Sequence, residues 1–169
     1  LGGVPLLRDT HRLPYELQRA IGILTNPVVA WILSTVLLWV WHAPPAYGLA
    51  LESETVHGVQ HLCFLVGYLI YWWPLIVPPG DVGWLRGNTA RAFYLLAGMM
   101  QSALLGALIT FHGRVLYTEY LHAPGATPAS ALADQRLAGV VMWFPGAVVF
   151  AMAAVLVITE RAPQPVQSA

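Results

Sequence analysis

Long apolar stretches separated by short polar segments set the pattern of this chain. Four such stretches cover about residues 26–42, 55–77, 90–112 and 136–159. A helix rises 1.5 Å per residue and a bilayer core is about 30 Å thick, so the last three stretches are long enough to cross it. The first is shorter, at roughly 24 Å. A lipid-exposed backbone must satisfy its own hydrogen bonds. The pattern therefore predicts an all-α protein, a polytopic transmembrane helix bundle with four spans.

Proline and glycine mark the expected ends of these helices. Asn26-Pro27 combines a capping side chain with a proline at the first helical position. Pro44-Pro45 is expected to end the first span, and Pro78-Pro79-Gly80 the second, because the residue before a proline avoids the helical region. Gly113 ends the third. Thr127-Pro128 is expected to open a helix that continues into the fourth span.

The flanking segments and the arginines predict the orientation. Residues 1–23 alternate charged side chains with leucines and are expected to form a cytoplasmic interfacial segment, with a short helix after Pro14. Residues 160–169 form a Pro-rich polar tail. Cytoplasmic loops carry an excess of arginine and lysine. Six of the eight arginines fall on one side, which places both chain ends in the cytoplasm. The six are Arg8, Arg12, Arg19, Arg86, Arg91 and Arg161, against Arg114 and Arg136.

Composition supports a membrane protein and excludes several other classes. Hydrophobic residues make up 57% and charged residues 9%, against roughly 25% charged in a soluble domain. This composition makes membrane lipid the expected environment. A net charge of zero gives no nucleic-acid footprint. A single cysteine, Cys63, excludes an internal disulfide framework and a CxxC pair. No hydrolase triad order, phosphate loop or HExxH helix is present, so we do not expect an enzyme.

His57 and His61 stand four residues apart at the start of the second span. On a helix these positions share one face, so the two imidazoles can bind one metal ion. The alternative interpretation is two polar side chains that finish a helix end. His42, at the end of the first span, is expected on the same outer side. Met142 lies about 27 Å along its helix from Glu160, which gives it a similar depth.

Asp134 stands about two turns above Met142 on the last span. It would serve as a ligand, or orient a ligand histidine by accepting its second N–H. A surface salt bridge to Arg114 or Arg136 is the alternative. Imidazole suits copper and zinc, and a thioether selects Cu(I). The sequence therefore favours copper, as Cu(I) or Cu(II), over a hard ion.

At these residues the chain resembles the multi-span CtaG family of caa(3)-type cytochrome c oxidase assembly factors. The matching segments agree in order and spacing over most of residues 26–143. They are Asn26-Pro27, Trp41-His42-Ala43-Pro44 with Tyr47, His57-Gly-Val-Gln-His61 with Phe64, Tyr117 with Tyr120, and Asp134-Gln135-Arg-Leu-Ala-Gly139-Val-Val-Met142-Trp143.

The resemblance implies a multi-pass protein of the bacterial cytoplasmic membrane that helps to assemble a haem–copper oxidase, at the stage of copper supply. Expected partners are oxidase subunits and a periplasmic or extracytoplasmic copper chaperone. Family members usually carry glutamate where this chain has Gln60, which predicts weaker or altered metal binding in this copy. They also tend to have further spans upstream, so part of the bundle is expected to be missing from this chain.

The resulting hypothesis is a copper site near the outer surface with His42, His57 and His61 as its core and Met142 and Asp134 as additions. Copper would pass to a partner by ligand exchange.

Two other functions stay open from the sequence. His42 and His61 on different helices can ligate a b-type haem. A metal-free scaffold for oxidase subunits would instead use the small-residue stripe Gly98, Ser102 and Gly106 as a partner surface. Assembly that survives loss of the histidine pair but fails on bulky substitution in the stripe would favour the scaffold.

Overall fold

A computed structural model describes residues 14–76, 85 and 87–159. Within these residues the fold is helical and contains no strand, as predicted. The elements are α1 (Tyr15–Leu24), α2 (Pro27–His42), α3 (Pro44–Glu52), α4 (Glu54–Ile76), α5 (Asn88–Phe111), the short 3₁₀ helix η3 (Thr118–His122) and α6 (Pro128–Thr159).

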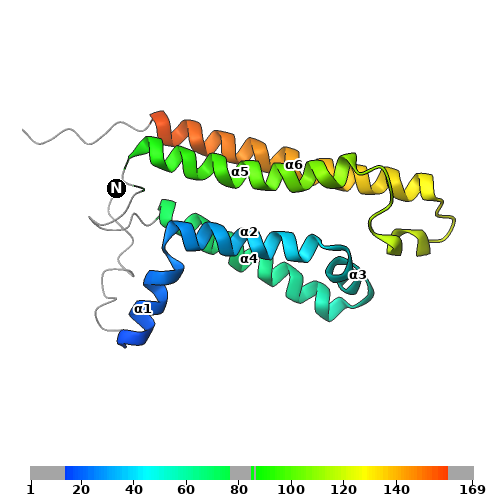
Figure 1. Ribbon diagram of the computed structural model, residues 1–169, viewed down its shortest axis with the longest axis horizontal. Coiled ribbons are helices and arrows are strands. Elements are labelled where there is room, and N and C mark those ends of the chain that lie inside the picture. Colours follow the sequence, from blue (N-terminus) through cyan, green and yellow to red (C-terminus); the bar gives the residue numbers. More distant parts are fainter. Residues whose placement is uncertain (1–13, 77–84, 86, 160–169) are drawn as a thin grey trace, which may run out of the picture.

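The helices form two antiparallel pairs (Figure 1). In one, α5 runs beside α6. In the other, α2 runs beside α4, with α3 at one end and α1 bent away at the opposite end. We use "histidine end" for the end that carries α3, η3, the end of α2 and the start of α4. It holds five histidines, His42, His57, His61, His112 and His122.

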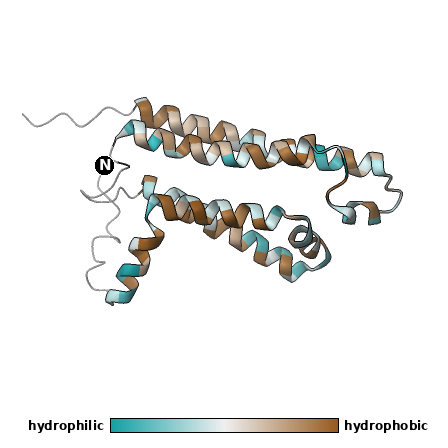
Figure 2. Ribbon diagram, in the orientation of Figure 1, coloured by the Kyte–Doolittle hydropathy of each residue, from teal (hydrophilic) through white to brown (hydrophobic). Residues whose placement is uncertain are grey.

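Three helices, α4, α5 and α6, are long and apolar enough to cross a membrane. A fourth span results if α1 and α2, which meet at 70°, count as one bent unit. Hydrophilic residues lie toward the helix ends, whereas the outward helix surfaces are largely apolar, as lipid-facing helices require (Figure 2). The protein is therefore a membrane protein. The predicted cytoplasmic segments 1–23 and 160–169 fall largely or wholly outside the described residues, and the orientation stays a prediction.

Local sequence signals explain the bounds of α2. The Asn26 side chain accepts hydrogen bonds from the Val28 and Val29 backbone N–H groups at 3.0 and 3.4 Å, and Pro27 occupies the first position. The helix ends at His42, because Ala43 is extended before Pro44. Pro44 then opens α3, which the sequence analysis did not predict. A proline that stops one helix can begin the next, since the first helical position needs no N–H donor.

The small-residue stripe of α5 lies inside the chain. Gly98, Ser102 and Gly106 are all buried. A Cβ atom on Gly98 would meet the Tyr71 ring of α4, and one on Gly106 would meet Trp143 of α6 at 2.6 Å. The stripe therefore packs helices of this chain together, as small residues do in lipid. It is not available as the partner surface that the scaffold interpretation requires.

Tyr71 and Tyr94 join the two helix pairs. Each hydroxyl donates a hydrogen bond to the other residue's carbonyl, both at 2.9 Å, and the rings stack with centroids 4.7 Å apart. Phe150 of α6 packs edge-on against Tyr71. These contacts hold α4, α5 and α6 together in the half of the bundle away from the histidine end.

Candidate metal site

His57 and His61 meet at the exposed start of α4. Their Nε2 atoms lie 2.7 Å apart, and their rings stack at 17° with centroids separated by 4.6 Å. Both side chains are exposed. The i, i+4 spacing brings them to one helix face, as predicted.

An N···N contact of this length requires one N–H donor and one bare lone pair. The two Nε2 atoms therefore share one hydrogen, which one nitrogen donates and the other accepts through its lone pair. A bound metal ion would take the place of that hydrogen. A tetrahedral ion with metal–nitrogen bonds of about 2.0 Å would hold the two nitrogens roughly 3.3 Å apart. A small side-chain rotation at an exposed position supplies that difference. The pair thus fits one ion with little rearrangement.

His42 lies at the end of α2 with its tautomer fixed. Its Nδ1 hydrogen-bonds the Leu38 carbonyl oxygen at 2.7 Å. A carbonyl only accepts, so the proton sits on Nδ1. Nε2 has no hydrogen-bond partner among the described residues. The His42 carbonyl accepts a hydrogen bond from the Tyr117 hydroxyl at 3.0 Å, and its ring stacks on Phe64 with centroids 5.4 Å apart.

His42 and Met142 line one cavity between the two helix pairs, the His42–Met142 cavity. It measures about 290 Å³ and is mostly apolar. Met142 is half-buried and packs against a cluster centred on Leu38, Leu105, Ile109 and Tyr117. The complete lining is His42, Tyr47, Ile109, Tyr117, Ala138, Gly139, Val141 and Met142.

The predicted ligands thus fall into separate places. No three His, Cys, Asp or Glu side chains in the described part of the chain come together as a metal-binding group. His57 and His61 form the exposed pair, while His42 and Met142 share the cavity. Phe64 contacts both rings, that of His42 face-on and that of His61 edge-on at 6.4 Å. Asp134 is exposed on α6, and its charge acts on Tyr120.

Gln60 faces away from the histidine pair. Its side chain is only 6% exposed, and its Nε2 donates a hydrogen bond to the Trp41 carbonyl at 3.3 Å. The amide therefore links α4 to the end of α2. Gln60 therefore contributes to the packing of α4 against α2, whereas the side chains of His57 and His61 are exposed.

Gln135 is a structural residue whose role the sequence analysis did not identify. Its side chain is fully buried. Its Oε1 accepts a hydrogen bond from the Leu116 N–H at 2.6 Å, and its Nε2 donates to the carbonyls of Ile109 and Arg114 at 3.3 and 3.1 Å. The signal was its spacing, because Gln135, Gly139 and Met142 recur on one face of α6. Gln135 fixes the segment that leads to Tyr117, and Tyr117 holds the end of α2.

Three tyrosines, Tyr47, Tyr117 and Tyr120, pack together at the histidine end. The hydroxyls of Tyr47 and Tyr120 hydrogen-bond at 3.0 Å, and the rings of Tyr47 and Tyr117 lie 4.2 Å apart. Burial, with a smaller effect from Tyr47, raises the pKa of Tyr117 to about 12. Burial also raises the pKa of Tyr120, with smaller effects from Tyr47, Tyr117 and Asp134. The phenols of Tyr117 and Tyr120 therefore stay protonated at neutral pH and offer no anionic oxygen.

Comparison with known families decides the class of protein. The model of the cytochrome c oxidase caa3 assembly factor family (Caa3_CtaG) matches residues 4–162, nearly the whole chain. The chain belongs to this family. A search of curated proteins found no match, and a search of solved structures found none. The resemblance inferred from the histidine and tyrosine segments is thus confirmed, and the family name supports a role in oxidase assembly.

Proposed function

We propose that this Caa3_CtaG protein binds copper on the His57–His61 pair and hands it to a haem–copper oxidase during assembly. Family membership supports the assembly role. The single observation that supports metal binding is the 2.7 Å contact between the two Nε2 atoms.

The chemistry of the pair favours copper over hard cations. Two neutral imidazoles offer borderline nitrogen donors, which suit copper and zinc, whereas Ca²⁺ and Mg²⁺ require several oxygen ligands. The exposed position leaves further coordination sites open to a donor from another protein. Two ligands from this chain hold the ion loosely enough for a partner to remove it by ligand exchange.

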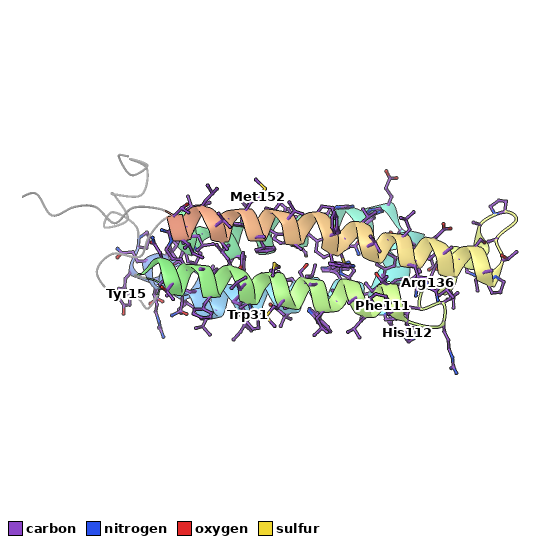
Figure 3. All side chains as sticks on the ribbon, turned by 90° about the horizontal axis from the view of Figure 1, so that it is seen from above. Tyr15, Trp31, Phe111, His112, Arg136 and Met152 are labelled. Carbon is purple, nitrogen blue, oxygen red and sulfur yellow. The ribbon has the colours of Figure 1, made fainter. Side chains whose placement is uncertain are left out.

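The arginine distribution supports an outward-facing pair. Arg19 in α1 and Arg91 near the start of α5 lie toward the end opposite the histidines (Figure 1). Arg114, which follows α5, and Arg136 in α6 lie at the histidine end, where Arg136 is labelled in Figure 3. The sequence pattern predicts the remaining four arginines at the end opposite the histidine pair, and this excess favours a cytoplasmic location for that end. The proposal therefore places the pair on the outer face of a bacterial cytoplasmic membrane. There it meets oxidase subunits and an extracytoplasmic copper chaperone.

Asp134 and Gln60 have supporting roles in this proposal. Asp134 is exposed beside Tyr120 and is absent from the lining of the His42–Met142 cavity. We assign it to the outer surface near η3, where a carboxylate can attract an approaching cation. Gln60 keeps α4 and α2 in register through its bond to Trp41.

Copper binding to the purified protein tests the proposal. The His57→Ala/His61→Ala variant is compared with wild type and with His122→Ala, which removes an exposed histidine from the same end. The pair variant is expected to lose one bound copper per chain relative to both. Equal copper in all three proteins would refute the proposal.

A further inference from the structure

We infer that His42 and Met142 form a second copper site, selective for Cu(I) and distinct from the His57–His61 pair. The inference rests on the proposed function, because it assumes that the protein handles copper. It deepens that function by adding a second, inner binding site that prefers Cu(I).

His42 is prepared as a ligand by its contact with Leu38. Metal-binding histidines usually donate their second N–H to a carbonyl or carboxylate, which fixes the tautomer and the ring orientation. The Nδ1 bond of His42 to the Leu38 carbonyl has this arrangement at 2.7 Å. The Phe64 ring stacked on the imidazole restrains it further. Nε2 therefore carries a lone pair, on a residue that lines the cavity.

Met142 supplies the donor that sets the preference of the site. A thioether is a soft, uncharged ligand that selects Cu(I) over divalent ions. The residue lines the same cavity as His42 from the opposite helix pair, on α6. A site with one ligand from each helix pair would link the two helix pairs at the histidine end.

The remaining lining argues against hard or divalent ions. The Tyr117 hydroxyl donates to the His42 carbonyl, and the Tyr47 hydroxyl is paired with that of Tyr120. Asp134 is absent from the lining. A mostly apolar cavity with one nitrogen and one sulfur donor favours an ion of low charge and low coordination number, such as Cu(I).

The cavity lies next to the exposed pair. Phe64 contacts the rings of both His42 and His61. Cu(I) bound first at the exposed pair would therefore reach the inner site over a short distance, by exchange of ligands and without a change of oxidation state. One site offers only nitrogen donors, and its neighbour offers a nitrogen and a softer sulfur donor. Two such sites suit a protein that receives an ion and then releases it.

Anaerobic titration with Cu(I) against a chromophoric chelator tests the inference. The starting protein is His57→Ala/His61→Ala, in which the pair is absent. It is expected to bind one Cu(I), and adding Met142→Leu should weaken that binding at least about tenfold, the lower end of what even outer-shell changes cause. Met152→Leu is the matched control, because Met152 projects from α6 on the side opposite α5 and is 61% exposed (Figure 3). X-ray absorption should show a sulfur neighbour at about 2.3 Å, the usual metal–sulfur distance, that Met142→Leu removes.

The outcomes separate this inference from the proposed function. If the pair variant binds no Cu(I) while wild type binds one, the inner site is refuted and the pair stands. If the pair variant binds as much copper as wild type and Met142→Leu abolishes binding in both, the inner site stands and the pair is refuted. Because Met142→Leu nearly conserves volume, an unchanged melting temperature in that variant excludes misfolding as the cause of lost binding.

Discussion

The Nε2 atoms of His57 and His61 lie 2.7 Å apart on one exposed face of α4. This contact depends on helical register, because only residues three or four apart face each other. It also sets the protonation of the pair, since one nitrogen must donate and the other accept. Because the register directs both nitrogens to one point, two surface histidines become a candidate copper site.

Moving one histidine out of register tests that geometry with the same number of histidines. In His57→Ala/Val59→His the number of histidines is unchanged, but positions 59 and 61 lie on different sides of the helix. Val59 is 47% exposed, so the exchange should not disturb the core. Copper affinity at the pair is expected to fall to that of the double alanine variant in a competition titration. Full affinity in the shifted protein would show that the 57–61 spacing is irrelevant.

Gln60→Glu tests whether position 60 acts on metal or on packing. The carboxylate cannot donate a hydrogen bond to the Trp41 carbonyl, and it places a charge at a site only 6% exposed. Stability should fall by about 1–3 kcal/mol. The loss should be larger at pH 8 than at pH 5, because a protonated carboxyl can still donate. Copper affinity of the pair should stay within a few-fold. A large gain in affinity with unchanged melting would assign the position to the metal.

The helices and the composition of the candidate site follow from the sequence, but its arrangement does not. Asn26-Pro27 predicts the start of α2, and helix arithmetic predicts that His42, His61 and Met142 share a depth. A shared depth does not determine how each helix is rotated about its own axis. That rotation decides which ligands lie close together. His42 shares the cavity with Met142, while His61 faces outward with His57. That outcome depends on contacts between helices, such as Gln60 with Trp41, which no local pattern encodes.

Gln135 should control the stability of the histidine end. Gln135→Leu removes the acceptor for the Leu116 N–H and the donor for the Ile109 and Arg114 carbonyls. Leaving buried backbone groups unpaired costs about 1–3 kcal/mol each. Thermal unfolding should therefore occur at a clearly lower temperature, and the Leu116 amide should exchange faster with solvent. Arg136→Ala, on the exposed neighbouring residue, is the control and should change neither quantity.

Gly139→Ala tests the close contact between α5 and α6. A Cβ atom at this position would approach the Gly106 carbonyl oxygen and the Thr110 backbone nitrogen to 2.9 Å, so the helices must separate. Overpacking of this kind typically costs about 1–3 kcal/mol. Gly146→Ala provides the comparison on the same helix, since nothing lies within 4 Å of its added Cβ atom. Equal melting temperatures for the two variants would contradict this packing.

The most direct test of copper supply by the His57–His61 pair is the copper-to-haem ratio of the oxidase that cells assemble. Cells without their own copy of the assembly factor would express wild type, His57→Ala/His61→Ala or His122→Ala at equal levels in copper-limited medium. Wild type and His122→Ala should yield oxidase with its full copper content. The pair variant should yield copper-poor oxidase that added copper restores. Full copper content with the pair variant would contradict the account.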